Sequence, residues 1–325
     1  MPSLSYARHC AEIAAQTELL RACVVGADLA APVPTCPGWN LGQLLWHLGG
    51  AHRWAETIVR TRAAGPVSEE LVNEVSGAAG QDLAALDAWL AEGAGQLADT
   101  LRAAGPDARV WTVAPGGTPA FWARRMVHET VIHRADALFT VAAAGSRGAC
   151  TVSGAAGAPG PATATGAPAV SGGRAPGFGV DRDVAVDALD EWMDFACLPQ
   201  VFATTPGLRG VMSGGRTLHF HATDAAPETA PDWLIGLGGD TLTWSRTPAP
   251  ATVAVRAPLA ELLLLLYGRR STHDAGTGDG NGRDGDSHNG SGSGGSSSRR
   301  NAIEITGEVP LLDAWLDGVS FWLKE

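Results

Sequence analysis

Apolar residues recur at three- and four-residue spacings over four long stretches in the first part of the chain. This is the period of an amphipathic helix. The stretches are residues 3–26, 41–62, 81–103 and 119–144. Asn40 is a good N-cap for the second stretch, and Pro119 takes the first helical position of the fourth. Modest loops join the stretches, so the pattern predicts an antiparallel four-helix bundle over residues 1–145.

The hydrophobic pattern changes in the second part of the chain. Residues 180–202 keep a helical spacing, and the short alternating or β-branched runs that follow are typical of strands. The runs are residues 216–222, 233–237, 241–245 and 252–255. Apolar residues then predict a buried helix at 257–267, a strand at 303–306 and a closing helix at 309–323. We therefore expect a smaller C-terminal α/β domain over residues 180–325, which makes the fold class α+β.

Two segments have almost no large apolar residues. Residues 146–179 are dominated by Ala, Gly, Pro, Thr and Ser, and residues 271–300 by Gly, Ser, Asp and Asn. Such compositions cannot bury enough surface to offset the entropy lost on ordering. We expect the first segment to be a linker between the two domains and the second to be a disordered insertion in the C-terminal domain.

The composition favours a soluble globular protein that acts on small molecules. The chain has 325 residues, of which 45% are hydrophobic, so it can build substantial cores. Its net charge of −11 and pI near 5.2 argue against broad binding to nucleic acid or to an anionic membrane, since both need a basic face. No apolar stretch is long enough to span a membrane, and the N-terminus lacks the features of a signal peptide. We expect a cytoplasmic protein that is a monomer or a weak homo-oligomer.

Lysine and cysteine usage excludes several kinds of site. Lys324 is the only lysine, so neither a Schiff-base lysine nor a P-loop lysine is available. The five cysteines are scattered and form no CxxC pair, which favours reduced thiols over a disulfide framework or cysteine-rich zinc binding. We interpret Cys36, which precedes Pro37, as a packing residue.

The strongest candidate chemistry lies on the fourth predicted helix. Glu129 and His133 are four residues apart, so a carboxylate and an imidazole reach one point beside the helix axis. The segment is not an HExxH zinc motif, because His128 and His133 are five residues apart. A metal site needs a third ligand from a neighbouring helix, and His47 on the second predicted helix is the best candidate. Without such a partner, an exposed helix face is the usual explanation of a Glu and His pair at this spacing.

Other polar residues have simpler interpretations. Asp136 lies almost directly above Glu129 on the helix and could orient His133, although an outward salt bridge explains it equally well. His219 and His221 alternate on one face of a predicted strand, a spacing that can bind metal. The sequence shows no third partner for these two histidines, so we interpret both as structural.

Two stretches of sequence resemble a known family. They are CPGWNLGQLLWHLGG at residues 36–50 with Trp54, and HE followed by VIHRAD at residues 128–136. In these stretches the chain resembles the mycothiol-dependent maleylpyruvate isomerase family, and the resemblance covers about residues 1–145. It implies that the N-terminal domain is a DinB-like four-helix bundle. It also implies that His47, Glu129 and His133 hold a divalent metal, usually zinc.

The resemblance is looser in the C-terminal domain. It depends there on LYGR at residues 266–269 and ITGE at residues 305–308. Enzymes of the family use an arginine of this domain near the active site, and Arg269 is the candidate for that role. The implied cofactors are a divalent metal and mycothiol, and the implied partner is a small electrophilic molecule.

The resemblance leaves more than one function open. In an isomerase, the thiol of mycothiol is activated for attack on the substrate, and the adduct rotates about a C–C bond and expels the thiol. If the adduct is kept, the same chemistry gives S-transfer. The third alternative is a non-catalytic metal-binding regulatory module. A thiol–zinc sensor would contribute cysteine ligands, and none is placed for that role, so the sequence favours an enzyme.

Overall fold

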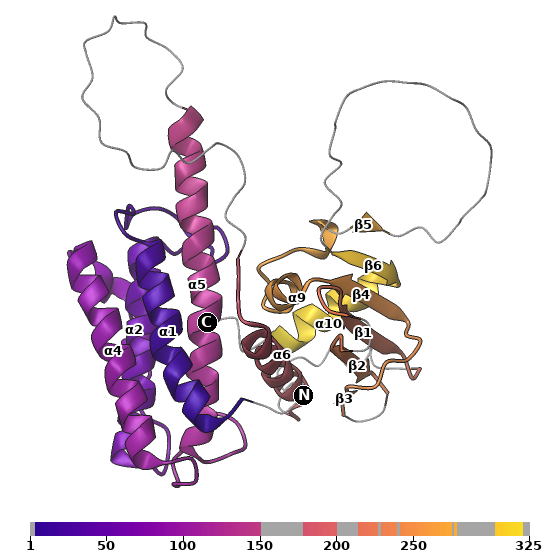
Figure 1. Cartoon of the computed structure of the whole chain (residues 1–325), viewed down its shortest axis with the longest axis horizontal. Helices are drawn as coiled ribbons and strands as arrows, with labels where there is room; N and C mark the ends of the chain where they lie inside the picture. Colours follow the sequence, from indigo (N-terminus) through magenta and orange to yellow (C-terminus); the bar gives the residue numbers. More distant parts are fainter. Residues whose placement is uncertain are drawn as a thin grey trace, which may run out of the picture. The chain divides into compact units, whose positions relative to one another are not determined.

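The computed structural model of the chain describes residues 4–150, 178–199, 214–226, 229–238, 241–274, 276–277 and 303–320. The chain forms two compact units, one of Leu4–Gly179 and the other built mainly from Val180–Glu325. The first is helical and the second combines helices with a mixed sheet, so the predicted α+β class is confirmed (Figure 1). Among the described residues, no helix has the length and apolar character needed to cross a membrane.

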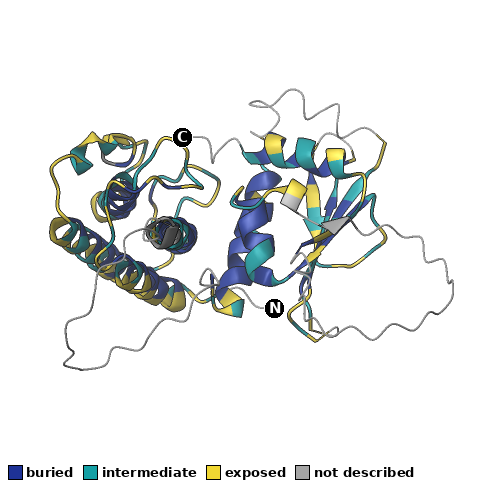
Figure 2. Cartoon of the chain, turned by 90° about the horizontal axis from the view of Figure 1, so that it is seen from above, coloured by how far each residue is buried: buried dark blue, intermediate teal, exposed yellow. Residues whose placement is uncertain are grey.

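Four long helices form the N-terminal unit, as the hydrophobic spacing predicts. They are α1 (Tyr6–Cys23), α2 (Leu41–Thr61), α4 (Leu83–Ala104) and α5 (Pro119–Cys150). The predicted cap of α2 is confirmed, because the Asn40 side chain accepts a hydrogen bond from the Gln43 backbone N–H and the Gln43 side chain accepts one from Asn40. Buried leucines from α1, α2 and α4 form a core cluster. They are Leu20, Leu41, Leu44, Leu45, Leu48, Leu86 and Leu90. In Figure 2 the buried parts of the ribbon are dark blue.

The segment after α2 turns back along that helix, and we call residues 63–82 the crossover segment. Arg62 has a left-handed backbone conformation with φ of 49°, which ends α2 and reverses the chain. The Trp54 indole then donates to the Val67 carbonyl at 3.2 Å. Further along, the Val72 carbonyl lies 2.9 Å from the ring of His47. The crossover segment therefore runs toward the start of α2.

Two short helices lie in the crossover segment. They are α3 (Glu70–Asn73) and η1 (Val75–Ala78). The sequence does not predict them, because each is only about one turn long and carries few apolar positions from which to recognise a period.

The crossover segment sets the directions of the long helices. Because it returns the chain to the start of α2, α4 runs parallel to α2, with Trp89 beside Trp46 and Glu92 paired with Arg53. By contrast, α5 runs antiparallel to α2, and α4 runs antiparallel to α1. Since α1 and α5 both run opposite to α2 and α4, they are parallel to each other as well, and His9 of α1 lies beside His128 of α5. The bundle thus contains two parallel pairs of neighbours, α2 with α4 and α1 with α5, within the predicted set of four helices. A connection as long as the crossover segment makes this possible.

A six-stranded mixed sheet forms the centre of the C-terminal unit, with the strand order β3-β2-β1-β4-β6-β5. The strands are β1 (Thr217–Ala222), β2 (Asp232–Gly236), β3 (Thr243–Ser245), β4 (Val253–Ala257), β5 (Gly276–Thr277) and β6 (Glu304–Gly307). β1 is parallel to β4 and β5 is parallel to β6, whereas the other pairs are antiparallel.

Helices cover one face of this sheet. They are α6 (Arg182–Ala196), α9 (Leu259–Leu266) and α10 (Val309–Val319). Phe220 of β1 packs against Trp315 of α10, which in turn packs against Trp192 of α6. Because side chains alternate along a strand, His219 and His221 of β1 point to the opposite face.

The two low-complexity segments lie mainly outside the described residues. Residues 146–150, at the start of the predicted linker, continue α5, whereas residues 151–177 are not described. At the start of the predicted insertion, the chain forms η2 (Thr272–Asp274) and the short strand β5. The ordered part of the C-terminal unit thus extends past the predicted boundary at residue 271. Disorder of the remaining residues stays a prediction.

Trp89 is tightly enclosed where α2 meets α4. It stacks on Trp46 with ring centroids 4.6 Å apart, and the Arg53 guanidinium lies 3.4 Å from the centroid of its ring. A Cβ added to Gly49 would come within 2.1 Å of Trp89 Cδ1. Only a residue without a side chain therefore allows this approach of the two helices.

We predict that Gly49→Ala lowers the free energy of unfolding by about 1–3 kcal/mol, because the new methyl group displaces the enclosed ring. The matched control is Gly95→Ala on α4, where an added Cβ meets nothing within 4 Å. That variant should gain roughly 0.5–1 kcal/mol from helix propensity. Urea denaturation measures the free energy of unfolding of both variants. Equal stability of the two variants would contradict the close contact between Gly49 and Trp89.

Candidate metal centre

Two antiparallel helices bring the three predicted ligands together. His47 lies on α2, and Glu129 and His133 lie one turn apart on α5. Glu129 Oε1 is 3.4 Å from His47 Nε2 and 3.0 Å from His133 Nε2. One donor atom from each residue lies within 4.8 Å of the other two. The structure therefore assembles the donor set that the sequence predicts.

The donor set is largely shielded from solvent. His47 is 2% exposed and His133 is 7% exposed. The indole of Trp39, in the loop before α2, lies against the His47 ring with centroids 4.8 Å apart. In such surroundings water competes weakly for polar groups, so a charge at the centre interacts strongly with its neighbours.

Hydrogen bonds fix which nitrogen each ring presents to the centre. His47 Nδ1 lies 2.9 Å from the Val72 carbonyl oxygen, and His133 Nδ1 lies 2.9 Å from Asp136 Oδ2. A carbonyl or carboxylate oxygen accepts, so each Nδ1 donates and each Nε2 faces Glu129. The expected orienting role of Asp136 thus has a geometric basis. The sequence gives no signal for Val72, because its contribution comes from the main chain.

Asp136 is held by residues from the loop before α2. It is fully buried, and the Thr35 hydroxyl donates to its Oδ1 at 2.6 Å. The Cys36 thiol lies 3.4 Å from its Oδ2, and Cys36, His133 and Asp136 form a further group of potential ligands. The packing interpretation of Cys36 is therefore incomplete, because its sulfur is aimed at this carboxylate. Sequence reasoning also missed Thr35, which directly precedes Cys36.

Glu129 keeps its negative charge although it is enclosed. Its Oε2 accepts a hydrogen bond from Arg125, one turn earlier on α5. Burial raises the pKa of Glu129, but the charges of Arg125 and His133 outweigh burial and hold that pKa well below its usual value. Burial lowers the pKa of His133, but Glu129 and Asp136 raise it well above its usual value. A divalent cation would compete with the proton between His133 and Glu129.

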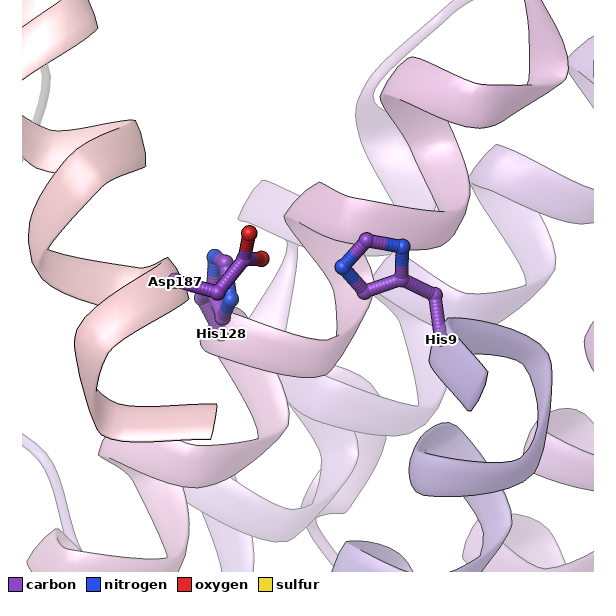
Figure 3. A group of neighbouring side chains, drawn as sticks. All are labelled: His9, His128 and Asp187. Atoms are coloured by element: carbon purple, nitrogen blue, oxygen red, sulfur yellow. The ribbon is translucent and has the colours of Figure 1, made fainter. Parts of the chain in front are cut away.

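The neighbouring histidines of α2 and α5, His52 and His128, point away from the donor set. His128 lies beside His9 of α1 in an edge-to-face arrangement with ring centroids 6.3 Å apart (Figure 3). His52 Nε2 lies 2.9 Å from the Thr130 hydroxyl oxygen. Neither His128 nor His52 shares a group of potential ligands with Glu129. The five-residue spacing from His128 to His133 therefore separates the two rings, as helix geometry requires.

Arg269 lies in the C-terminal unit, just after α9. Its Nη1 donates to the Tyr267 carbonyl at 2.7 Å, and Gly268 between them has φ of 71°. These contacts describe a tight turn that positions the guanidinium within its own unit. Its role toward a substrate stays a prediction.

Comparison with known proteins gives matches in both units. Residues 10–138 match the model of the mycothiol maleylpyruvate isomerase N-terminal domain, and residues 183–286 match that of the MDMPI C-terminal domain. The chain is similar to the crystal structure of the mycothiol-dependent maleylpyruvate isomerase, with 12% sequence identity and a TM-score of 0.49 over 82% of this chain and 91% of that one. A histidine-to-alanine mutant of that isomerase gives a TM-score of 0.48 with the same identity and coverage. No curated protein matches the chain.

His52 is a buried neutral histidine at the contact between α2 and α5. It is fully buried, and the Thr130 hydroxyl that accepts from its Nε2 donates in turn to the Met126 carbonyl at 2.7 Å. Its Nδ1 has no hydrogen-bond partner among the described residues. Burial lowers the pKa of His52 from 6.5 to about 3. Protonation of this ring is therefore incompatible with the folded unit at mildly acidic pH.

We predict that His52 makes the folded protein sensitive to acid. The unfolded chain binds a proton at this ring near pH 6.5, and the folded protein does so only near pH 3, so stability is lost as the pH falls through this window. Between roughly pH 7 and pH 5 the loss amounts to about 2 kcal/mol. His52→Gln should remove this share of the pH dependence, and His273→Gln, at an exposed position, should keep it. Urea denaturation at both pH values tests this, and equal pH dependence in all three proteins would refute it.

Proposed function

Because the chain belongs to the mycothiol maleylpyruvate isomerase family, we propose that it is an enzyme that requires a divalent metal and mycothiol and isomerises a small electrophilic substrate. The observation that carries this proposal is the convergence of one donor atom each from His47, Glu129 and His133. Family membership supports the requirement for mycothiol, and the donor set supports the requirement for a divalent metal.

The donor set fits a divalent ion such as zinc. Two imidazole nitrogens and one carboxylate oxygen are a usual ligand set of catalytic zinc, and they leave one position open. Ligand atoms around a tetrahedral ion with bonds of about 2.0–2.1 Å lie roughly 3.3 Å apart. The distances of 3.0 and 3.4 Å from Glu129 to the two rings are close to this separation. When bound, such an ion lowers the pKa of a thiol and so supplies a nucleophile at neutral pH.

The surrounding residues hold the donor set in one arrangement. The Val72 carbonyl and Asp136 fix the two rings through Nδ1, and Arg125 binds the oxygen of Glu129 that faces away from them. Because these side chains are held before any ligand arrives, little reorganisation is needed when one binds. Trp39 covers the His47 ring and limits the access of water.

We predict that each of the three ligands is required for metal binding at this centre. His47→Ala, Glu129→Gln and His133→Ala should each lower the metal content by about one equivalent per chain. Asp136→Asn should weaken binding by about 10–100-fold, because His133 loses the charged acceptor of its Nδ1. His273→Ala, at an exposed position of the C-terminal unit, is the control. Elemental analysis after dialysis measures the content, and unchanged content in all three ligand variants would refute the site.

Turnover should require both the metal and mycothiol. The assay combines the protein with mycothiol and a panel of electrophiles that includes maleylpyruvate, and it separates the products by mass. A product of unchanged mass supports isomerisation, whereas an adduct heavier by one mycothiol would show S-transfer instead. Absence of turnover with every electrophile, together with absence of thiol binding, would favour a regulatory metal-binding module.

Arg269 is our candidate for binding a carboxylate of the substrate. A planar guanidinium binds a carboxylate through two parallel hydrogen bonds, which an ammonium group cannot reproduce. Arg269→Lys should therefore lower kcat/KM and leave the metal content unchanged. The matched control is Arg270→Lys, at a residue whose Nε binds Glu261 at 2.8 Å. Equal activity of the two variants would exclude a specific role for Arg269.

A further inference from the structure

Two histidines and an aspartate lie together on the sheet of the C-terminal unit. Their donor atoms do not all lie within 4.8 Å of one another, as those of the N-terminal centre do. His219 and His221 are two residues apart on β1, and both point to the face opposite the buried Phe220. Asp232 of β2 pairs directly with His221 in the strand register, so its side chain lies on the same face. The sequence shows no third partner for the two histidines, and the structure supplies one from the neighbouring strand.

One carboxylate oxygen lies between the two rings. Asp232 Oδ1 is 2.7 Å from His219 Nε2 and 2.9 Å from His221 Nδ1. The side chains are 15% exposed for His219, 18% for His221 and 13% for Asp232. The group is therefore enclosed enough to be ordered and open enough for an ion to reach it without disturbing the core.

We propose that His219, His221 and Asp232 form a second divalent-metal site, suited to zinc and similar first-row ions. The two imidazoles coordinate through His219 Nε2 and His221 Nδ1, and Asp232 provides the third ligand. In the present arrangement these two nitrogens donate to Asp232, because a carboxylate oxygen accepts. Metal binding therefore requires each neutral ring to carry its proton on the other nitrogen instead. This ligand set leaves a fourth position for water.

The present distances show what binding requires. The ring centroids of His219 and His221 are 6.3 Å apart, and the Asp232 oxygen lies between the rings at hydrogen-bond distance. Bonds of about 2.0–2.1 Å to a shared ion need the rings to turn toward each other and the carboxylate to withdraw by roughly a bond length. Side chains on a partly exposed sheet face can make such rotations without moving the backbone.

The neighbouring strands favour ions that bind imidazole over hard cations. Arg256 of β4 is the register partner of His221, and Glu304 of β6 is the register partner of Arg256. The positive charge of Arg256 repels cations, so electrostatic attraction alone does not hold an ion here. The affinity for a metal ion has to come from the two imidazole nitrogens. Such ligands suit Zn²⁺, whereas Mg²⁺ and Ca²⁺ prefer oxygen.

The test separates this site from the N-terminal centre. Equilibrium dialysis of the full chain against Zn²⁺ is carried out in a His47→Ala/His133→Ala background. About one zinc ion should remain bound, and adding His219→Asn/His221→Asn should remove it, whereas adding His273→Asn should not. Circular dichroism confirms the fold of each variant. Absence of zinc in the background variant, or zinc retained after His219→Asn/His221→Asn, would overturn the proposal.

A second measurement keeps the proposal testable if the background variant does not fold. Wild type and His219→Asn/His221→Asn, which leaves the N-terminal centre intact, are compared at saturating Zn²⁺. The variant should bind about one ion fewer, and equal stoichiometry would overturn the proposal. In wild type, Mg²⁺ at the same concentration as Zn²⁺ should not displace the second zinc ion. Displacement by Mg²⁺ would contradict the assignment of imidazole ligands. Neither outcome depends on the enzymatic activity.

Discussion

The hydrogen bond between His47 and the main-chain carbonyl of Val72 links the fold of the N-terminal unit to its chemistry. It holds the crossover segment against α2, and that segment determines that α4 starts beside the start of α2. The same bond leaves His47 Nε2 directed at Glu129. Without the return of the chain along α2, the bundle would have a different order of neighbours and His47 would lack its acceptor.

Sequence reasoning recovers the features that depend on side-chain periodicity. The long helices follow from the spacing of apolar residues, and Glu129 and His133 follow from their four-residue spacing on one helix. His47 lies on another helix, so its place beside them rests on the family resemblance until the packing is known. Val72 and Thr35 escape such reasoning, because a carbonyl has no residue signature and a loop hydroxyl has no period.

In the C-terminal unit, too, the sequence predicts which residues share a face and leaves their partners on other strands unknown. The alternation along β1 predicts that His219 and His221 share a face, which the structure confirms. Asp232 becomes their partner only through the antiparallel register of β1 and β2, and one sequence does not fix that register. The short elements η2 and β5 were missed because they lie in a stretch whose composition resembles the low-complexity residues after it.

The acceptor that orients His47 belongs to the backbone, and this affects how the protein can change during evolution. A substitution at position 72 replaces a side chain and leaves the carbonyl in place. The orientation of the His47 ring therefore tolerates the exchange of Val72 for other apolar residues. A single-residue insertion or deletion within the crossover segment would instead shift a different peptide unit to this point. The centre is thus robust to point substitution in this segment and sensitive to a change in its length.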